Sequence, residues 1–216
     1  YATGSRLVRL YAFTYLYHPG ACETHLWPCA ERNMARSGLA PAAHRLVQEL
    51  KQRFEKDLNA AFGSLDPATW LALFIPNTDV TFNLRLTKEI GGAAAEPKTI
   101  KLYTGGMCSY LAKCKMCTGA VPGPAVASTM FGKLKKAGYE RSTIKVKKYK
   151  SVSKTEAMVA CAVQRFKAGE KKPYEEFAAL YSAVNIDGKW MIRDMWAFDD
   201  LAKPPTSVPL ADFKKC

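Results

Sequence analysis

Acidic residues and histidines are scarce in this chain, which has 19 Asp and Glu and three His against 32 Lys and Arg among 216 residues. The net charge of +13 favours an anionic partner, such as an acidic protein, a nucleic acid or a membrane surface, without choosing among them. Long apolar runs are missing as well, because no stretch approaches the roughly 20 apolar residues that cross a bilayer. We therefore expect no transmembrane segment. The hydrophobic content of 48% is enough for one substantial core.

A disulfide framework is also absent. The cysteines number seven, an odd count for a chain of this length, which favours free thiols in a reducing compartment. We accordingly expect an intracellular protein, in the cytosol or in an organelle. The cysteines are Cys22, Cys29, Cys108, Cys114, Cys117, Cys161 and Cys216.

Three of these cysteines lie close together in the stretch MCSYLAKCKMCTG. The C-x-x-C turn from Cys114 to Cys117 can direct two thiolates at one metal ion, and Cys108 could join them as a third ligand. A fourth ligand is missing nearby and would have to come from a distant segment. Zinc ligation, a redox pair and incidental free thiols all stay open. We predict that the chain binds no metal and no cofactor.

Composition divides the chain into three parts. Residues 1–40 show no sustained period and predict an irregular arm, whereas residues 41–200 predict a folded domain. An insertion rich in Gly and Pro, which holds the cysteine cluster, interrupts this domain at about 91–124. The proline-rich residues 201–216 predict an extended tail.

The domain begins with helices and ends with strands. Apolar residues at steps of three and four predict a helix that ends near Gly63, and Asp66-Pro67 supplies the cap and first-turn proline of a second, short helix. This order predicts an α+β fold in which a curved antiparallel sheet wraps around three helices. The third helix is expected at 125–137, and alternation predicts strands at 80–86, 142–152, 156–167, 174–186 and 189–198.

The stretch YSAVNIDGKWMIRDMWAF, residues 181–198, predicts two strands joined by a tight Asp-Gly turn. On the second strand, a two-residue period places Trp190, Ile192, Trp196 and Phe198 on one face, with Asp194 in their middle. A carboxylate on an apolar face is either neutralised by a partner or lines a cavity, because an unpaired buried charge is costly. Asp194 is therefore the first candidate for chemistry.

Two stretches resemble the two ends of the domain sequence in the nuclear transport factor two-like superfamily. This superfamily includes SnoaL-type polyketide cyclases, ketosteroid isomerases and scytalone dehydratase. The two stretches are RFEKDLNAAFGSLDPATWLALFIPNTDVTF, residues 53–82, and the terminal YSAVNIDGKWMIRDMWAF. The resemblance implies a cone-like half-barrel with a pocket between the concave face of the sheet and the first helix. Its motifs are specific for the fold rather than for a function.

The resemblance also implies catalytic roles, two of which this chain has lost. The oxyanion-donating tyrosine on the first helix of ketosteroid isomerases matches Phe54, and the carboxylate base on the first strand matches Asn83. What remains for an enzyme is Asp194 as acid–base, with Tyr181 on the neighbouring strand and His44 at the head of the first helix. The pocket is expected to be lined by Phe54, Asn83, Trp190 and Trp196.

Each candidate has a structural interpretation as well. Asp194 next to Arg193 can be a satisfied ion pair, since structural pairs also perturb pKa values. His44 lies at a helix start, where surface residues are common. Tyr181 and the tryptophans bury well on a concave sheet.

Basic residues concentrate at 133–154, where nine Lys and Arg stand against one Glu. The two-residue period places Lys145, Lys147 and Tyr149 on one strand face, with Lys148 and Lys150 on the other. Such a run is either a solvated face that guards a sheet edge or a docking surface for an acidic protein. Without a nucleic-acid motif, sequence-specific nucleic-acid binding is not expected. The candidates for partner binding are Lys133, Lys135, Lys136, Lys145, Lys147, Lys148 and Lys150.

Two functions follow. The first is a non-catalytic binding or scaffold module that docks on an acidic partner, belongs to a larger assembly or pairs with a second copy through its sheet. The second is a cofactor-independent lyase, isomerase or cyclase that acts on a small apolar substrate through Asp194. An open apolar cavity beside Asp194 would favour the enzyme, and bulky side chains filling that space would favour the module.

Overall fold

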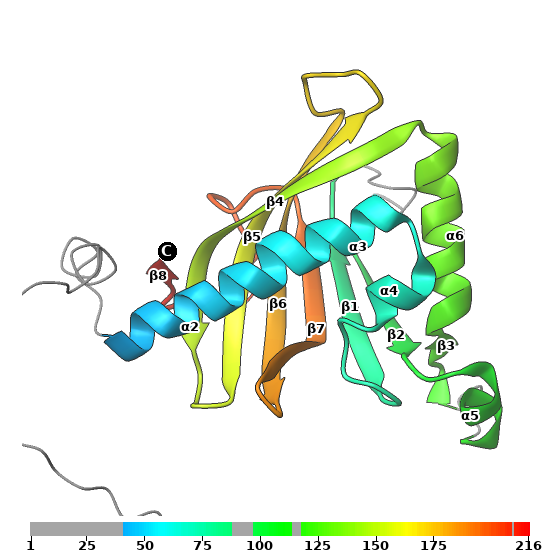
Figure 1. Ribbon diagram of the computed structural model, residues 1–216, viewed down its shortest axis with the longest axis horizontal. Coiled ribbons are helices and arrows are strands. Elements are labelled where there is room, and N and C mark those ends of the chain that lie inside the picture. Colours follow the sequence, from blue (N-terminus) through cyan, green and yellow to red (C-terminus); the bar gives the residue numbers. More distant parts are fainter. Residues whose placement is uncertain (1–40, 88–96, 114–117, 209) are drawn as a thin grey trace, which may run out of the picture. The chain divides into compact units, whose positions relative to one another are not determined.

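The computed structural model describes residues 41–87, 97–113, 118–208 and 210–216. The arm expected at 1–40 and two parts of the expected insertion, residues 91–96 and residues 114–117 with Cys114 and Cys117, lie outside these residues. The described strands form one curved sheet in the order β3-β2-β1-β7-β6-β5-β4-β8 (Figure 1). They are β1 Asp79–Arg85, β2 Lys98–Tyr103, β3 Val121–Pro122, β4 Tyr139–Ser151, β5 Glu156–Lys167, β6 Glu175–Ile186, β7 Lys189–Phe198 and β8 Lys214–Lys215.

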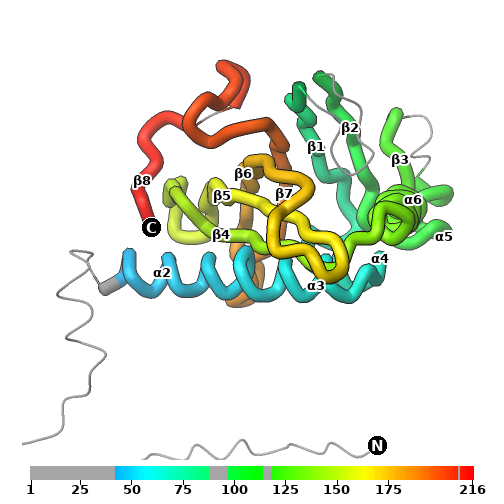
Figure 2. Tube along the Cα trace, turned by 90° about the horizontal axis from the view of Figure 1, so that it is seen from above, coloured from blue at the N-terminus to red at the C-terminus, as the bar shows by residue number. Residues whose placement is uncertain are grey.

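A continuous helix runs along one face of this sheet (Figure 2). It consists of α2 Pro41–Lys51, a π-helical stretch η1 Gln52–Asp57, and α3 Leu58–Ser64. The helix ends at Ser64, and the next residue, Leu65, has a left-handed φ of 50°. Its buried side packs on the sheet through apolar residues that recur at steps of three and four, among them Leu50, Phe54 and Leu58.

Three shorter helices complete the described part: α4 Pro67–Leu71, α5 Met107–Ala112 and α6 Gly123–Lys136. The carboxylate of Asp66 accepts hydrogen bonds from the backbone N–H groups of Ala68 and Thr69, at 3.4 and 2.8 Å. The predicted cap and first-turn proline of α4 are therefore confirmed. The structure also confirms the α6 prediction, although the helix begins two residues earlier, at Gly123.

The strands from β4 to β7 form an antiparallel meander. At the turn between β6 and β7, Asp187 and Gly188 take φ values of 51° and 80°, as a tight hairpin requires. β7 then pairs with β1 in parallel, and β1 pairs with β2 in antiparallel fashion. An α+β fold with a curved, mostly antiparallel sheet wrapped around helices is thus confirmed.

Helix side chains also cover part of the β4 edge. The N–H of Val146 donates to Glu55 Oε1 at 2.8 Å, and the N–H of Ile144 donates to Asn59 Oδ1 at 3.1 Å. These two backbone donors face away from β5 and would otherwise be open to pairing with another chain. Farther along, β8 pairs with the same edge at Lys148 and Tyr149.

The described sheet has three register shifts, one of them between Tyr139 and Arg141 at the start of β4, and the other two decide which face the candidate residues occupy. In β7, Ser182 lies opposite Asp194 while the next residue, Ala183, lies opposite Ile192, so Arg193 is the extra residue. In β4, Val146 lies opposite Cys161 and Lys148 lies opposite Ala160, so Lys147 is the extra residue. At each bulge the alternation between the two faces is reversed.

The tail crosses the face of the sheet that the helices leave uncovered (Figure 2). A buried cluster on this outer face includes Leu180 and Phe198, with Val208 from the tail. Trp196 and Phe213 pack against the same cluster. The sheet therefore has apolar packing on both faces.

Candidate functional site

Asp194 lies on the outer face of the sheet. The expectation that it shares a face with Trp190 and Ile192 is wrong, because the bulge at Arg193 reverses the alternation. Ile192 pairs with Phe74 of the α4–β1 connection on the helix side. Trp196, two residues beyond Asp194, packs on the cluster under the tail.

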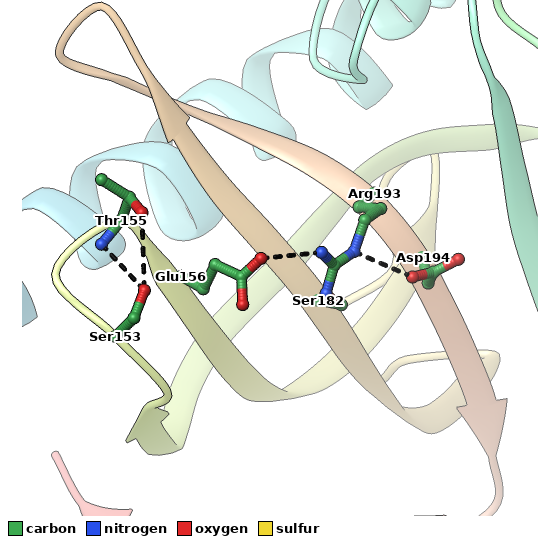
Figure 3. A network of polar contacts seen from close by, with 6 residues as sticks. All are labelled: Ser153, Thr155, Glu156, Ser182, Arg193 and Asp194. Carbon is green, nitrogen blue, oxygen red and sulfur yellow. Dashed lines mark hydrogen bonds and ion pairs between the residues drawn. The ribbon is translucent and has the colours of Figure 1, made fainter.

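The guanidinium of Arg193 ties together the polar side chains of this region (Figure 3). It lies 3.3 Å from Asp194 Oδ2 and 2.9 Å from Glu156 Oε1, and it donates to the buried hydroxyl of Ser182 at 3.0 Å. The carboxylate of Asp194 is therefore neutralised at a partly exposed position. Asp194 was expected to be either an acid–base group or an ion-pair partner, and this geometry favours the ion pair.

A cavity of about 570 Å³ opens on the opposite, helix-covered face. Its walls come from α3, α4, α6 and six strands, and they are largely apolar. Among the lining residues are Phe62, Trp70, Phe74, Phe82 and Met195. Its size and apolar walls are those of a small-molecule pocket.

The charged residues in the described lining are all basic. They are Lys98 on β2, Lys133 on α6 and Arg165 on β5, and no Asp, Glu or His of the described chain lines the cavity. Acid–base chemistry on a bound molecule requires a group that exchanges a proton near the working pH. The described walls offer no carboxylate or imidazole for this purpose.

Tyr181 is the one candidate catalytic residue that the structure places in the cavity wall. Its ring packs on Phe54, with ring centroids 5.1 Å apart. Burial raises the pKa of Tyr181 well above its ordinary value, so the phenol stays protonated at neutral pH. In that form it can donate a hydrogen bond but cannot act as a base.

The other predicted site residues are not brought together. His44 is in α2, about 20 Å along the helix from Leu58 in the cavity wall, at 1.5 Å per residue. Phe54 is fully buried in the core but does not line the cavity. Asn83 points away from the cavity-lining residues Phe82 and Leu84, and its Oδ1 accepts from Thr99 Oγ1 at 3.1 Å.

The two tryptophans expected in the pocket lie outside it as well. Trp196 is on the outer face, whereas Trp190 donates from its indole N–H to Glu49 Oε2 at 3.1 Å. Trp190 lines a second, more polar cavity of about 560 Å³ between α2, β4 and the tail. The carboxylates of that cavity are each paired with a cation, Glu49 with Arg45 at 3.0 Å and Asp212 with Lys150 at 3.5 Å.

Arg165 is a buried charged residue that sequence reasoning missed. Only 5% of it is exposed, and its guanidinium lies 2.7 Å from Glu175 Oε2. The same group lies over the ring of Phe177, 5.0 Å from the centroid. The structure places Arg165 opposite Glu175 in the pairing of β5 with β6. A signal was present in the sequence, because the two-residue period that puts Cys161 and Val163 on one face puts Arg165 on the same face.

The candidate partner-binding lysines fall into two groups. Lys133, Lys135 and Lys136 are exposed in the last turn of α6. On β4, the bulge at Lys147 corrects the expected faces: Lys145 and Lys148 lie on the outer face, and Tyr149 is buried on the helix side. Lys147 is the exposed bulge residue itself, and Lys150 pairs with Asp212 of the tail at 3.5 Å.

Cys108 is exposed, and the other two cysteines of its cluster lie outside the described residues. Within the described part of the chain, no group of three or more His, Cys, Asp or Glu is placed to hold a metal ion. Burial raises the pKa of the Cys161 thiol, which is fully enclosed. No described helix combines the length and the apolar character needed to cross a bilayer.

Comparison with known proteins yields structural matches only. No family model and no curated protein matches the chain. A domain of unknown function with a cystatin-like fold from Nostoc punctiforme is 13% identical, with a TM-score of 0.45 and coverage of 81% of this chain and 80% of that one. An NTF-2-like protein of unknown function from Shewanella oneidensis is 14% identical, with a TM-score of 0.42 and coverage of 73% and 98%.

A putative calcium/calmodulin-dependent protein kinase type II association domain from Thiobacillus denitrificans is 15% identical, with a TM-score of 0.43 and coverage of 67% and 90%. Similarity at this level concerns the arrangement of helices and strands and says nothing of function.

Proposed function

We propose that this chain is a non-catalytic module that binds a small apolar molecule in the cavity on the helix side of its sheet. The observation that carries the proposal is the separation of Asp194 from that cavity by the thickness of the sheet. The described cavity walls hold aromatic and aliphatic side chains, three basic residues and a tyrosine with a raised pKa. Such walls can bind and orient a ligand, but they provide no proton acceptor for the lyase, isomerase or cyclase alternative.

Binding of a neutral, fluorescent apolar probe, N-phenylnaphthylamine, tests this proposal. Thr129 and Ser128 are adjacent exposed residues of α6, and only Thr129 lines the cavity. We expect saturable binding to the wild type, weakened by Thr129→Trp, which narrows the cavity, and unchanged by Ser128→Trp. Absence of saturable binding, or equal weakening by both variants, would overturn the proposal.

A second candidate function, docking on an acidic surface, is supported by one feature of the sheet edge. Lys148 lies directly opposite Lys215 in the pairing of β4 with β8. Like charges placed opposite each other across two strands destabilise the pair. An acidic partner bound there would offset this repulsion, in addition to the general attraction that the net charge of +13 exerts.

A further inference from the structure

The basic residues of the cavity gather at one of its ends. β1 and β5 end, and β2 and β6 begin, at the same end of the sheet, because β1 is parallel to β7 and the other neighbouring pairs from β2 to β5 are antiparallel. Lys98 opens β2, and Arg165 lies near the end of β5. Lys133 lies in the last turn of α6, which leads directly into β4 at this end.

These three residues differ in burial. Arg165 is buried and already paired with Glu175 at 2.7 Å, so its charge is largely neutralised within the wall. Lys98 and Lys133 are exposed as well as cavity-lining, which places them at the opening. Apart from Thr129, the rest of the described lining is aliphatic and aromatic, including Trp70 and Phe74.

An apolar cavity with a positive opening matches one ligand chemistry in particular. We infer that the cavity binds a carboxylate that carries a hydrocarbon chain. The chain lies in the cavity, and the carboxylate group lies between Lys98 and Lys133. This inference rests on the proposed function, because it names the class of ligand for the same cavity. Low-dielectric walls strengthen the attraction of such an opening for an anion.

The helix dipole alone does not explain both lysines. A lysine in the last turn of α6 is favourable near the negative end of the helix, which accounts for Lys133 and for its neighbours Lys135 and Lys136. Lys98 is on a strand, where no such effect acts. It shares the cavity face of β2 with Ile100 and Leu102, whereas Lys101 falls on the opposite face.

Decanoate and decanol, which share a hydrocarbon chain and differ in charge, provide the test. The variant that carries both Lys98→Gln and Lys133→Gln removes the two charges at the opening. The matched control carries Lys101→Gln and Lys136→Gln, which lie on the same strand and the same helix but do not line the cavity. Both double variants have the same net charge, so non-specific attraction is equal in the two.

We expect the full chain to bind decanoate more tightly than decanol in calorimetric titrations, with a preference that shrinks as salt is added. The Lys98→Gln and Lys133→Gln double variant should lose roughly tenfold in decanoate affinity and keep its decanol affinity, since two exposed ionic contacts contribute on that order. The control double variant should keep the preference.

The other outcomes are distinct. Equal binding of decanoate and decanol by the wild type would overturn this inference and leave the proposed function standing. A preference that survives in the Lys98→Gln and Lys133→Gln variant, or that falls equally in the control, would also overturn it. If neither compound nor the neutral fluorescent probe binds, both the inference and the proposed function fail.

Discussion

Arg193 and Asp194 are neighbours in sequence and form an ion pair, with Nε of Arg193 3.3 Å from Oδ2 of Asp194. Neighbours in a regular strand point to opposite faces, and the bulge at Arg193 allows this contact. The bulge also separates the tryptophans of β7, sending Trp190 toward α2 and Trp196 toward the tail. One extra residue thus decides that the carboxylate faces away from the cavity.

The first prediction concerns Asp194→Asn. The ion pair is partly exposed, with 44% of the Arg193 side chain and 25% of the Asp194 side chain accessible, so its loss should lower the free energy of unfolding by about 1 kcal/mol or less. Ligand binding in the cavity should not change. Urea unfolding and titration with the fluorescent probe check the two statements. A large loss of probe affinity with an unchanged free energy of unfolding would show that Asp194 contributes to ligand binding.

Much of the fold was predictable because its local signals agree with its packing. The cap at Asp66, the turn at Asp187 and Gly188, and the alternating strands are determined by short stretches of sequence. The faces of β4 and β7 were not predictable in full. A bulge leaves the composition of a strand unchanged, so the two-residue period was carried past Lys147 and Arg193, where the structure reverses it.

The sequence predicted that a pocket exists but not all of the residues that line it. The resemblance implied a pocket between the sheet and the first helix, and Phe82 and Leu84 do face it from β1. Lys98 and Val121 come from the region interpreted as an insertion, and their contribution depends on the pairing of β2 with β1 and β3. Pairing between segments distant in sequence leaves no periodic signal in a single chain.

The second prediction concerns the alkaline range. Burial raises the pKa of Tyr181 above its ordinary value of 10.0, so above about pH 10 the unfolded chain loses this proton while the folded chain keeps it. The contribution of protonated Tyr181 to folding stability is therefore fully present below about pH 10 and is lost as the pH rises above it. Above about pH 10, Tyr181→Phe should make the decline in unfolding free energy shallower by about 1.4 kcal/mol per pH unit.

Urea unfolding of the wild type and of Tyr181→Phe across this range, under reducing conditions, provides the measurement. Tyr174, whose pKa burial raises to about 12, contributes in the same direction in both proteins and therefore cancels in the difference. Below about pH 9 the difference between the two proteins should be constant. If the unfolding free energies of the two proteins change in parallel over the whole pH range, Tyr181 ionises in the folded state as readily as in the unfolded chain.

The third prediction concerns the tail. Val208 is buried against Leu180 and Phe198 on the outer face of the sheet. A chain that stops after Leu201 should expose this apolar face and associate as its concentration rises, as sedimentation would measure. Val208→Ala is the control: it should lower the unfolding free energy by about 1–2 kcal/mol without association. A truncated chain that stays monomeric and equally stable would show that the tail contributes no packing.

The fourth prediction concerns the sheet edge where Lys148 lies opposite Lys215. Replacing Lys148 with Glu turns a repulsive cross-strand pair into an attractive one, so Lys148→Glu should raise the free energy of unfolding by up to about 1 kcal/mol at low salt. The gain should shrink as salt screens the pair. The control is Lys172→Glu, an exposed residue in the connection from β5 to β6, which changes the net charge equally without touching β8.

The same two variants also test docking on an acidic surface. Retention on immobilised polyglutamate should fall more for Lys148→Glu than for Lys172→Glu, because Lys148 shares the outer face with Lys145 and lies beside Lys215. Retention should also fall with added salt in every case. Equal retention of the two variants, together with equal unfolding free energies, would mean that only the overall charge matters. Lys148 and Lys215 would then be ordinary solvated residues at a sheet edge.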